Sequence, residues 1–238
     1  MKKMAVLLLA CTLLSGCATG QIGCTVGVSS ITNGEKIISG KTCAIISGMK
    51  DINKDDLQYK EFERYIAKAL TKKGYAITDN INEADIVVFL TYGIGDPQKH
   101  VFSYAVPVFG QTGVSSSQTF GTVQGFGNMA TYSGNTTYTP SYGVVGATPM
   151  VGEETLYTRY IRLDAFDMKA FRESKKEKRL WTTDMVSTGS SDDLRGVFPV
   201  MIAASEQYIG ENTQEKKRIL ITLNDKRVLE IKSDSTGQ

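Results

Sequence analysis

The most reactive side chains of this chain are its four cysteines, Cys11, Cys17, Cys24 and Cys43. A thiol can take a lipid, bond to a second thiol or act as a nucleophile, and its surroundings decide which. The chain has a single histidine, His100. The sequence contains no Gly-x-Ser-x-Gly turn, no zinc-protease helix motif and no phosphate-binding loop. We therefore expect no catalytic residues, no metal site and no cofactor, and the cysteines point to lipid attachment and disulfide formation.

Cys17 ends the sequence Leu14-Ser15-Gly16-Cys17, which directly follows a short apolar segment. Two lysines precede the apolar run from Met4 to Leu14, which is far shorter than the roughly 20 residues of a membrane-crossing helix. This order is typical of a secretory signal, and the small residues before the cysteine resemble the bacterial lipobox. The resemblance implies that residues 1–16 are removed and that Cys17 becomes a lipidated N-terminus, which anchors the chain to a membrane. The alternative is an ordinary signal peptide with an incidental cysteine.

The residue after the cysteine, Ala18, resembles the pattern that directs lipoproteins of two-membrane bacteria to the outer membrane. An Asp at this place usually retains them at the inner membrane. In such an envelope we expect an outer-membrane anchor and a periplasmic protein. The net charge of +2 comes from the two lysines of the signal, so the remaining basic and acidic residues balance. A neutral chain has no electrostatic footprint for nucleic acid.

Cys24 and Cys43 flank Asn33-Gly34, a strong signal for a two-residue hairpin loop. In such a hairpin residue i faces residue 67 minus i, which places the two cysteines opposite each other and within disulfide reach. We predict a structural disulfide between them in the oxidising envelope. Two free thiols, or an irregular lipidated tether over 17–41, are the alternatives.

From residue 42 the pattern is that of one α+β domain, residues 42–232, followed by a disordered tail, residues 233–238. It predicts strands, including a closing hairpin around Asn224-Asp225, and two main helices. The predicted strands are 42–47, 84–92, 157–171, 179–188, 219–223 and 227–231. The first helix begins at Asp55 or Asp56 and ends at Gly74, and the second covers 192–209 with Pro199 opening or kinking it. The expected fold is a mixed, mainly antiparallel sheet with these helices packed on it. Asp164 and Asp167 are expected on opposite faces of their strand, which argues against a carboxylate pair.

A long insertion, residues 93–156, interrupts this domain. Between His100 and Gly152 it has no Asp, Glu, Lys or Arg and is rich in Gly, Ser, Thr and Tyr. Three interpretations are open: a flexible or β-ribbon excursion, a segment for partner docking or self-assembly, and a membrane-inserting hairpin. Gly and Pro interrupt the alternation that the third would need.

The chain resembles an uncharacterised family of bacterial envelope lipoproteins that carry a domain of unknown function. The resemblance runs from Thr42 to Ile231 apart from the insertion. Its motifs are Phe62…Ile66…Leu70, Lys73-Gly74-Tyr75, Ala84 to Tyr92, Arg162 to Asp167, Leu180-Trp181, and Asp193-Leu194-Arg195 ahead of Pro199. It implies a mixed sheet with helices packed on it and carries over no activity.

The function expected from the sequence is therefore a non-enzymatic structural or interaction role at the outer membrane. The partner would be an envelope protein. The first alternative is a subunit that self-associates through the insertion, and an envelope hydrolase is the second.

Overall fold

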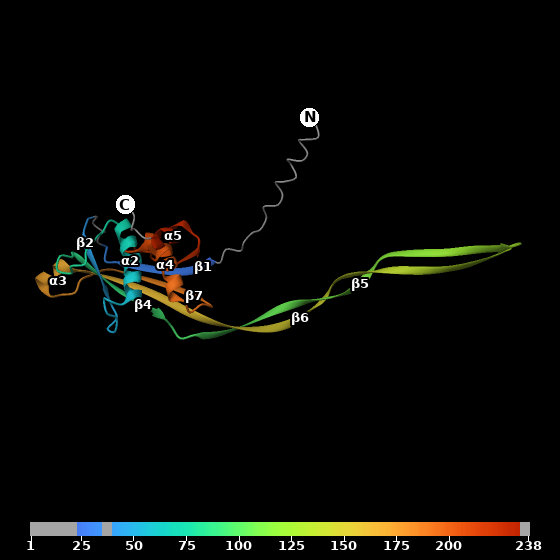
Figure 1. Cartoon of the computed structure of the whole chain (residues 1–238), viewed down its shortest axis with the longest axis horizontal. Helices are drawn as coiled ribbons and strands as arrows, with labels where there is room; N and C mark the ends of the chain where they lie inside the picture. The colour runs from blue at the N-terminus through green and yellow to red at the C-terminus, as the bar shows by residue number, and fades with distance from the viewer. Residues whose placement is uncertain (1–22, 35–39, 234–238) are drawn as a thin grey trace, which may run out of the picture. The chain divides into compact units, whose positions relative to one another are not determined.

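The computed structural model describes residues 23–34 and 40–233 (Figure 1). The predicted signal peptide, Cys17 and residues 234–238 lie outside the described residues. The chain divides into two units. The first combines the segment up to residue 98 with the segment from residue 156 onward, and the second is residues 99–155.

The first unit is built on one mixed sheet in the order β3-β2-β4-β6-β7-β1-β8. Strand β2 pairs in parallel with β3 and β4, and all other pairs of this path are antiparallel. The predicted α+β class with a mixed, mainly antiparallel sheet is thus confirmed. The strands are β1 (Gly23–Thr32), β2 (Thr42–Ser47), β3 (Ala76–Ile77), β4 (Ile86–Ile94), β6 (Met129–Asp167, here from residue 156), β7 (Arg179–Gly189) and β8 (Lys217–Thr222).

Four α-helices lie in the described part of the chain: α2 (Leu57–Lys72), α3 (Met168–Ser174), α4 (Leu194–Ser205) and α5 (Lys226–Lys232), with a 3-10 turn, η1 (Glu206–Tyr208). As predicted, Asp56 caps the first long helix, because its carboxylate accepts a hydrogen bond from the Tyr59 backbone N–H at 2.8 Å. Helix α4 contains Pro199. None of the described helices is long and apolar enough to cross a membrane.

The core lies where α2 and α4 meet one face of the sheet, the side on which Figure 1 shows α2, α4 and α5. The rings of Phe62 on α2 and Phe198 on α4 stack with centroids 3.8 Å apart, and Tyr92 on β4 meets Phe62 edge-on at 4.9 Å. Alternate residues of β1, including Val26 and Val28, are fully buried in the same cluster. This single apolar layer fixes which face of every strand is covered.

The hairpin predicted around Asn33-Gly34 is wrong, and with it the Cys24–Cys43 disulfide. Strand β1 lies between β7 and β8 and β2 lies beside β4, so three strands separate β1 from β2. Four strand spacings amount to about 19 Å, whereas bonded cysteines have Cα atoms less than about 7 Å apart. Both thiols are free, and that of Cys24 lies 3.1 Å from the Ser187 hydroxyl. The same finding corrects the tether expected over 17–41, since residues 23–32 belong to the sheet.

One further predicted strand is a helix, and so is the end of another. Residues 226–232 form α5, capped by Asp225, whose carboxylate accepts from the Arg227 N–H. Val228 and Ile231 on α5 are buried and are three residues apart, a spacing that places both on one face of a helix but on opposite faces of a strand. Likewise the strand expected to reach Phe171 ends at Asp167, which caps α3.

The second unit is a two-stranded ribbon and falls within the predicted insertion, residues 93–156. It is formed by β5 (Gln98–Phe126) and the distal part of β6, joined by Gly127-Asn128. Gly127 has φ +60°, which such a tight loop requires and glycine adopts freely. At the base, Lys99 pairs with Glu153 at 2.8 Å. At about 3.3 Å per residue, 29 residues extend roughly 90 Å.

The free thiols lead to a test by alkylation of the folded chain without reductant, followed by peptide mapping. Only the thiolate reacts, and burial raises the pKa of the Cys43 thiol to about 12. We expect iodoacetamide to label Cys24, which is partly exposed, and to label Cys43 only after unfolding. A Cys24→Ser variant serves as the control for Cys43. Recovery of both peptides unlabelled after unfolding, and labelled once reduced, would restore the disulfide.

Candidate functional site

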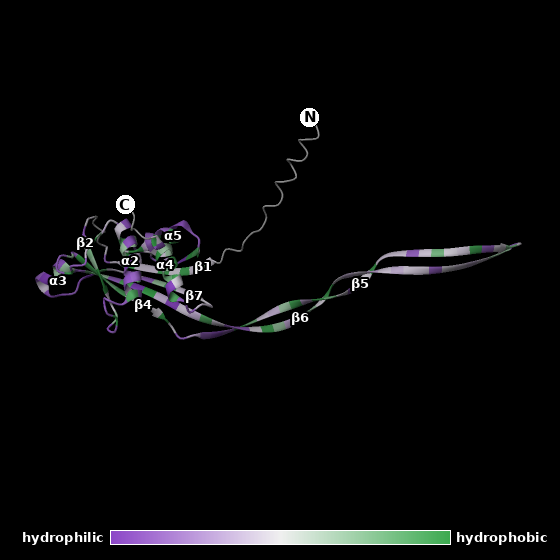
Figure 2. Ribbon diagram, viewed as in Figure 1, coloured by the Kyte–Doolittle hydropathy of each residue, from purple (hydrophilic) through white to green (hydrophobic). Residues whose placement is uncertain are grey.

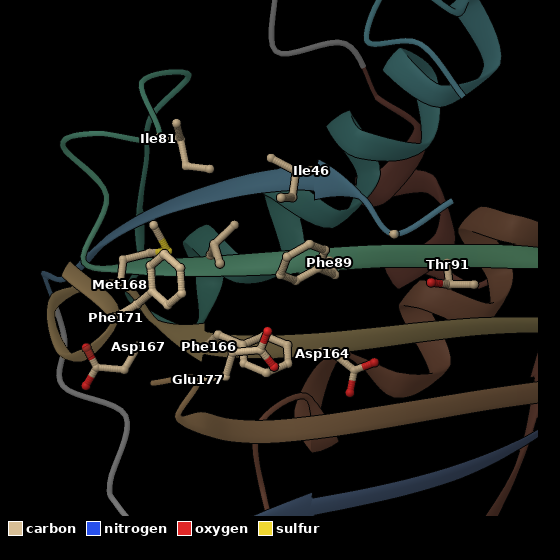
Figure 3. A pocket seen from close by; sticks show the side chains of 12 residues that line it. Ile46, Ile81, Phe89, Thr91, Asp164, Phe166, Asp167, Met168, Phe171 and Glu177 are labelled. Atoms are coloured by element: carbon tan, nitrogen blue, oxygen red, sulfur yellow. The ribbon is translucent and has the colours of Figure 1, made fainter. Parts of the chain in front are cut away.

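A hollow of the first unit lies on the sheet face opposite α2 and α4. It has a volume of about 430 Å³, within the range of small-molecule sites. Its walls are largely apolar and come from β2, β4, β6 and α3 (Figure 3). The apolar lining residues are Ile46, Ile81, Val87, Phe89, Phe166, Met168 and Phe171.

Phe89 and Phe166 form the floor of this pocket. They point to the same face of adjacent antiparallel strands, and their rings meet edge to face with centroids 5.4 Å apart. The Arg179 guanidinium lies over the Phe166 ring, 5.2 Å from its centroid. The floor is therefore aromatic, with one cationic edge.

Helix α3 forms one wall and is held by backbone contacts. The Met168 N–H donates to the carbonyl of Asp85 at 2.9 Å. Arg172 donates from one guanidinium nitrogen to the carbonyls of Ala84 at 2.7 Å and Ile81 at 3.0 Å. These contacts fix the loop before β4 against α3, and so bring Ile81 and Phe171 to the same pocket.

Asp164 and Asp167 both contribute to the lining of this pocket. Asp167 is the last residue of β6, where the chain turns into α3, and it stands opposite Ile86, whereas Asp164 stands opposite Phe89. Figure 3 nevertheless shows them at opposite ends of the site, with Phe166 between. They do not form a pair that shares a proton.

Both carboxylates already have partners. Asp167 accepts from the Ala170 N–H as the cap of α3. Asp164 accepts from the Thr182 hydroxyl at 2.6 Å and from Arg162 at 3.1 Å. Glu177 is the third acidic lining residue. The lining thus lacks a nucleophile with an adjacent base, and its chemistry is that of an apolar binding surface.

The sequence-predicted site residues do not gather at this pocket. Cys17 lies outside the described residues, Cys43 is buried on the covered face, and Cys24 contacts Ser187. In the described part of the chain no group of three or more His, Cys, Asp or Glu side chains could hold a metal ion. His100 lies in the ribbon, where its Nδ1 is 3.3 Å from a Glu154 carboxylate oxygen.

The ribbon is the second candidate surface. Figure 2 shows apolar bands along both of its strands, between pale and polar stretches. Threonine and serine hydroxyls pair across the strands, as at Thr119 and Thr136, 2.9 Å apart. Most of its large apolar side chains are exposed, among them Phe109, Phe120, Phe126, Met129, Tyr142 and Val151. The signal that the insertion is a hairpin was Gly127-Asn128, a two-residue loop flanked by strand-forming residues.

No family model and no curated protein matches the chain. Among solved structures, a PDZ domain protein from Parabacteroides distasonis ATCC 8503 aligns with a TM-score of 0.36 and 13% identity, over 85% of this chain and 40% of that one. The lysenin pore aligns with a TM-score of 0.12 and 13% identity, over 85% of this chain and 50% of that one. The chain therefore spans half or less of these proteins, and likeness at this level carries no functional argument.

The loop beside the pocket leads to a pH prediction for Asp85. Its carboxylate accepts hydrogen bonds from the Thr42 backbone N–H at 2.9 Å and from the Thr42 hydroxyl at 3.0 Å, which lower the pKa of Asp85. Since the folded-state pKa lies below that of the unfolded chain, ionised Asp85 stabilises the fold above roughly pH 4. That contribution is lost as the pH falls through the folded-state pKa.

We therefore expect Asp85→Asn to lower the free energy of unfolding by roughly 1 kcal/mol at pH 7 and by much less at pH 3. Urea unfolding at the two pH values measures this. Asp51→Asn, on an exposed turn before α2, is the control. An equal loss at both pH values would show that the ionised form of Asp85 has no special role.

Proposed function

We propose that this chain is a lipid-anchored protein of the bacterial envelope with a structural role, and that its copies associate through the ribbon. In this proposal the first unit is the scaffold, with α2 and α4 packed on its sheet, and the ribbon is an insertion that serves assembly. Cys17 carries the anchor at the periplasmic face of the outer membrane. The observation that carries the proposal is a long ribbon that has no Asp, Glu, Lys or Arg between His100 and Gly152 and whose outer edges are unpaired within the described residues.

The open edges are the physical reason for association. Along residues 99–155 each ribbon strand pairs on one side only, with the other ribbon strand, within the described residues. The opposite side presents unpaired N–H and C=O groups, which are a template for another strand. A lone two-stranded hairpin is at best marginally stable in water. Pairing β5 of one copy with β6 of the next would satisfy both edges.

The composition of the ribbon favours this pairing. Natural edge strands are usually protected by charged residues, especially lysine, or by proline. Between His100 and Gly152 the ribbon has no Asp, Glu, Lys or Arg. Its prolines are Pro107, Pro140 and Pro149. The distal stretches 108–126 and 129–139 therefore contain neither a charged residue nor a proline. These two stretches are the expected interface.

The anchor suits this role because the folded sheet begins only a few residues after it. β1 begins at Gly23, and six residues of any conformation span at most about 20 Å. The first unit would therefore stay close to the membrane that holds Cys17, and neighbouring copies would share one orientation. A shared surface also raises their effective concentration.

The anchor has its own test. Cys17→Ser removes the thiol that would be acylated, so we expect the protein to move from the detergent-rich to the aqueous phase in phase separation, or to remain unprocessed. Cys24→Ser, which leaves Cys17 in place, is the matched control. An unchanged partition of Cys17→Ser, with the mass of a processed chain, would contradict the lipid anchor.

Assembly is tested with the double variant Ser117→Lys and Thr137→Lys, which adds the charges that edge strands normally carry. Both sites are exposed and lie in the proline-free distal stretches. Burying or opposing these charges at a strand contact is unfavourable, so we expect association to weaken about tenfold or more, or 1.4 kcal/mol. Sedimentation velocity of the full chain in detergent gives the oligomeric state.

Leu229→Lys is the matched control, because it places a lysine at an exposed apolar site on α5, outside the ribbon. Oligomers of the parent chain and of Leu229→Lys, with monomers of the double variant, would support the proposal. A monomeric parent chain, or an oligomer that the two ribbon lysines leave unchanged, would overturn it.

A further inference from the structure

The far end of the ribbon carries a concentration of exposed apolar side chains. Phe120, Val123, Phe126 and Met129 all lie within ten residues around the Gly127-Asn128 loop. Phe126 is 90% exposed and Met129 is 80% exposed, and the other two are more than half exposed. We call these four residues the tip cluster. An apolar group of this kind in contact with water marks a binding surface.

The tip cluster covers both faces of the ribbon. Phe120 and Phe126 are an even number of residues apart on β5, so they share a face. Met129 stands opposite Phe126 across the two-residue loop and joins them on that face. Val123 points to the other face. An apolar end with side chains on both faces suits immersion in a medium better than contact with one flat surface.

Tyr132 lies on the Val123 face, and the two residues are equally far from the loop along their strands. Its ring occupies the space that a side chain at Gly121 or Gly134 would need, and both of these positions are glycine. The ring is thereby held flat against the ribbon while most of the side chain stays exposed. Tyrosine has an apolar ring and a polar hydroxyl, which favours the boundary between lipid and water.

We propose that the loop end of the tip cluster, Phe126 and Met129 with Val123, enters the interfacial layer of a lipid bilayer. Only side chains next to the loop need to leave water, and the polar backbone there stays within reach of hydrated headgroups. Interfacial segments are buried about 5–10 Å at the boundary of headgroups and acyl chains. That depth reaches the residues beside the loop, while Phe120, about 20 Å from Phe126 along β5, stays nearer the water. The inference is independent of edge pairing between copies, because each tip contacts lipid by itself.

Lipid is favoured over a protein partner by the charge distribution. From residue 100 to residue 152 there is no Asp, Glu, Lys or Arg. The tip therefore has no charge to desolvate on entering lipid and none with which to select a charged protein surface. The same fact predicts equal binding to zwitterionic and anionic bilayers, since polybasic attraction is missing.

The test places a tryptophan at the tip of the full chain, as Phe126→Trp, and adds vesicles of phosphatidylcholine brominated on its acyl chains. Ser117→Trp, nine residues earlier on the same strand, is the matched control, roughly 30 Å from the loop. The native Trp181 is 3% exposed, and the parent chain supplies its background signal. We expect the tip signal to fall at least about twofold and to shift to the blue, with the control unchanged.

A second measurement uses the non-acylated Cys17→Ser chain in vesicle flotation, with and without phosphatidylglycerol. Phe126→Asp combined with Met129→Asp should weaken binding about tenfold or more, while Leu229→Asp should not. No quenching at residue 126, or equal quenching at residue 117, would overturn the proposal. So would binding that requires phosphatidylglycerol.

Discussion

Backbone hydrogen bonding along β6 is the constraint on which the rest of this structure depends. In the first unit β6 pairs with β4 on one side and with β7 on the other, so its peptide groups are satisfied in both directions. In the second unit the same strand pairs on one side only, within the described residues. One strand thus passes from a fully paired to a half-paired state. The apolar core stabilises the fully paired part of the strand. In the half-paired part, the free N–H and C=O groups must bond to another strand or to water.

The first state rests on a single apolar layer. Phe62, Tyr92 and Phe198 meet from α2, β4 and α4, and the buried side of β1 adds Val26 and Val28. Because the period of a strand is two, this layer also decides which residues remain on the uncovered face. Phe89 and Phe166 are on that face for this reason, and with α3 they make the pocket. The pocket is thus a consequence of how the core is packed.

Local signals predicted the elements that are stabilised locally. Asp56 stabilises the start of α2 as its cap, and Phe62, Ile66 and Leu70 share one face of that helix. The β-branched run in β4 favours a strand in the same local way. Local signals do not decide which strand pairs with which. Asn33-Gly34 has the preferred loop residues, yet Asn33 continues the contact with β7, its N–H donating to the carbonyl of Leu180. Burial of β1 beside β7 and β8 outweighed the turn preference, and no local pattern reports such a distant choice.

The candidate site could be predicted less well than the fold. Its acidic residues were visible in the sequence, but the place where β6 ends at Asp167 was not, because the cap of α3 competes with continuation of the strand. The helix at 226–232 could have been predicted, because Val228 and Ile231 are three residues apart, which is a helical spacing, and Asp225 precedes them as a cap. The long uncharged insertion was recognisable from composition alone. Its two-residue loop, Gly127-Asn128, was the missed signal that would have defined it as one hairpin.

An uncharged ribbon of this length is a hazard for a freely diffusing protein, since any exposed strand could pair with it. In the proposed arrangement the anchor at Cys17 changes that situation. Copies held in one membrane have the same orientation, so β5 of one copy meets β6 of its neighbour antiparallel, as the two strands already meet within a chain. Such a contact is heterologous and extends until it closes on itself or forms an open filament. An anchor and a charge-free ribbon therefore belong together physically, because the first restricts the pairing that the second invites.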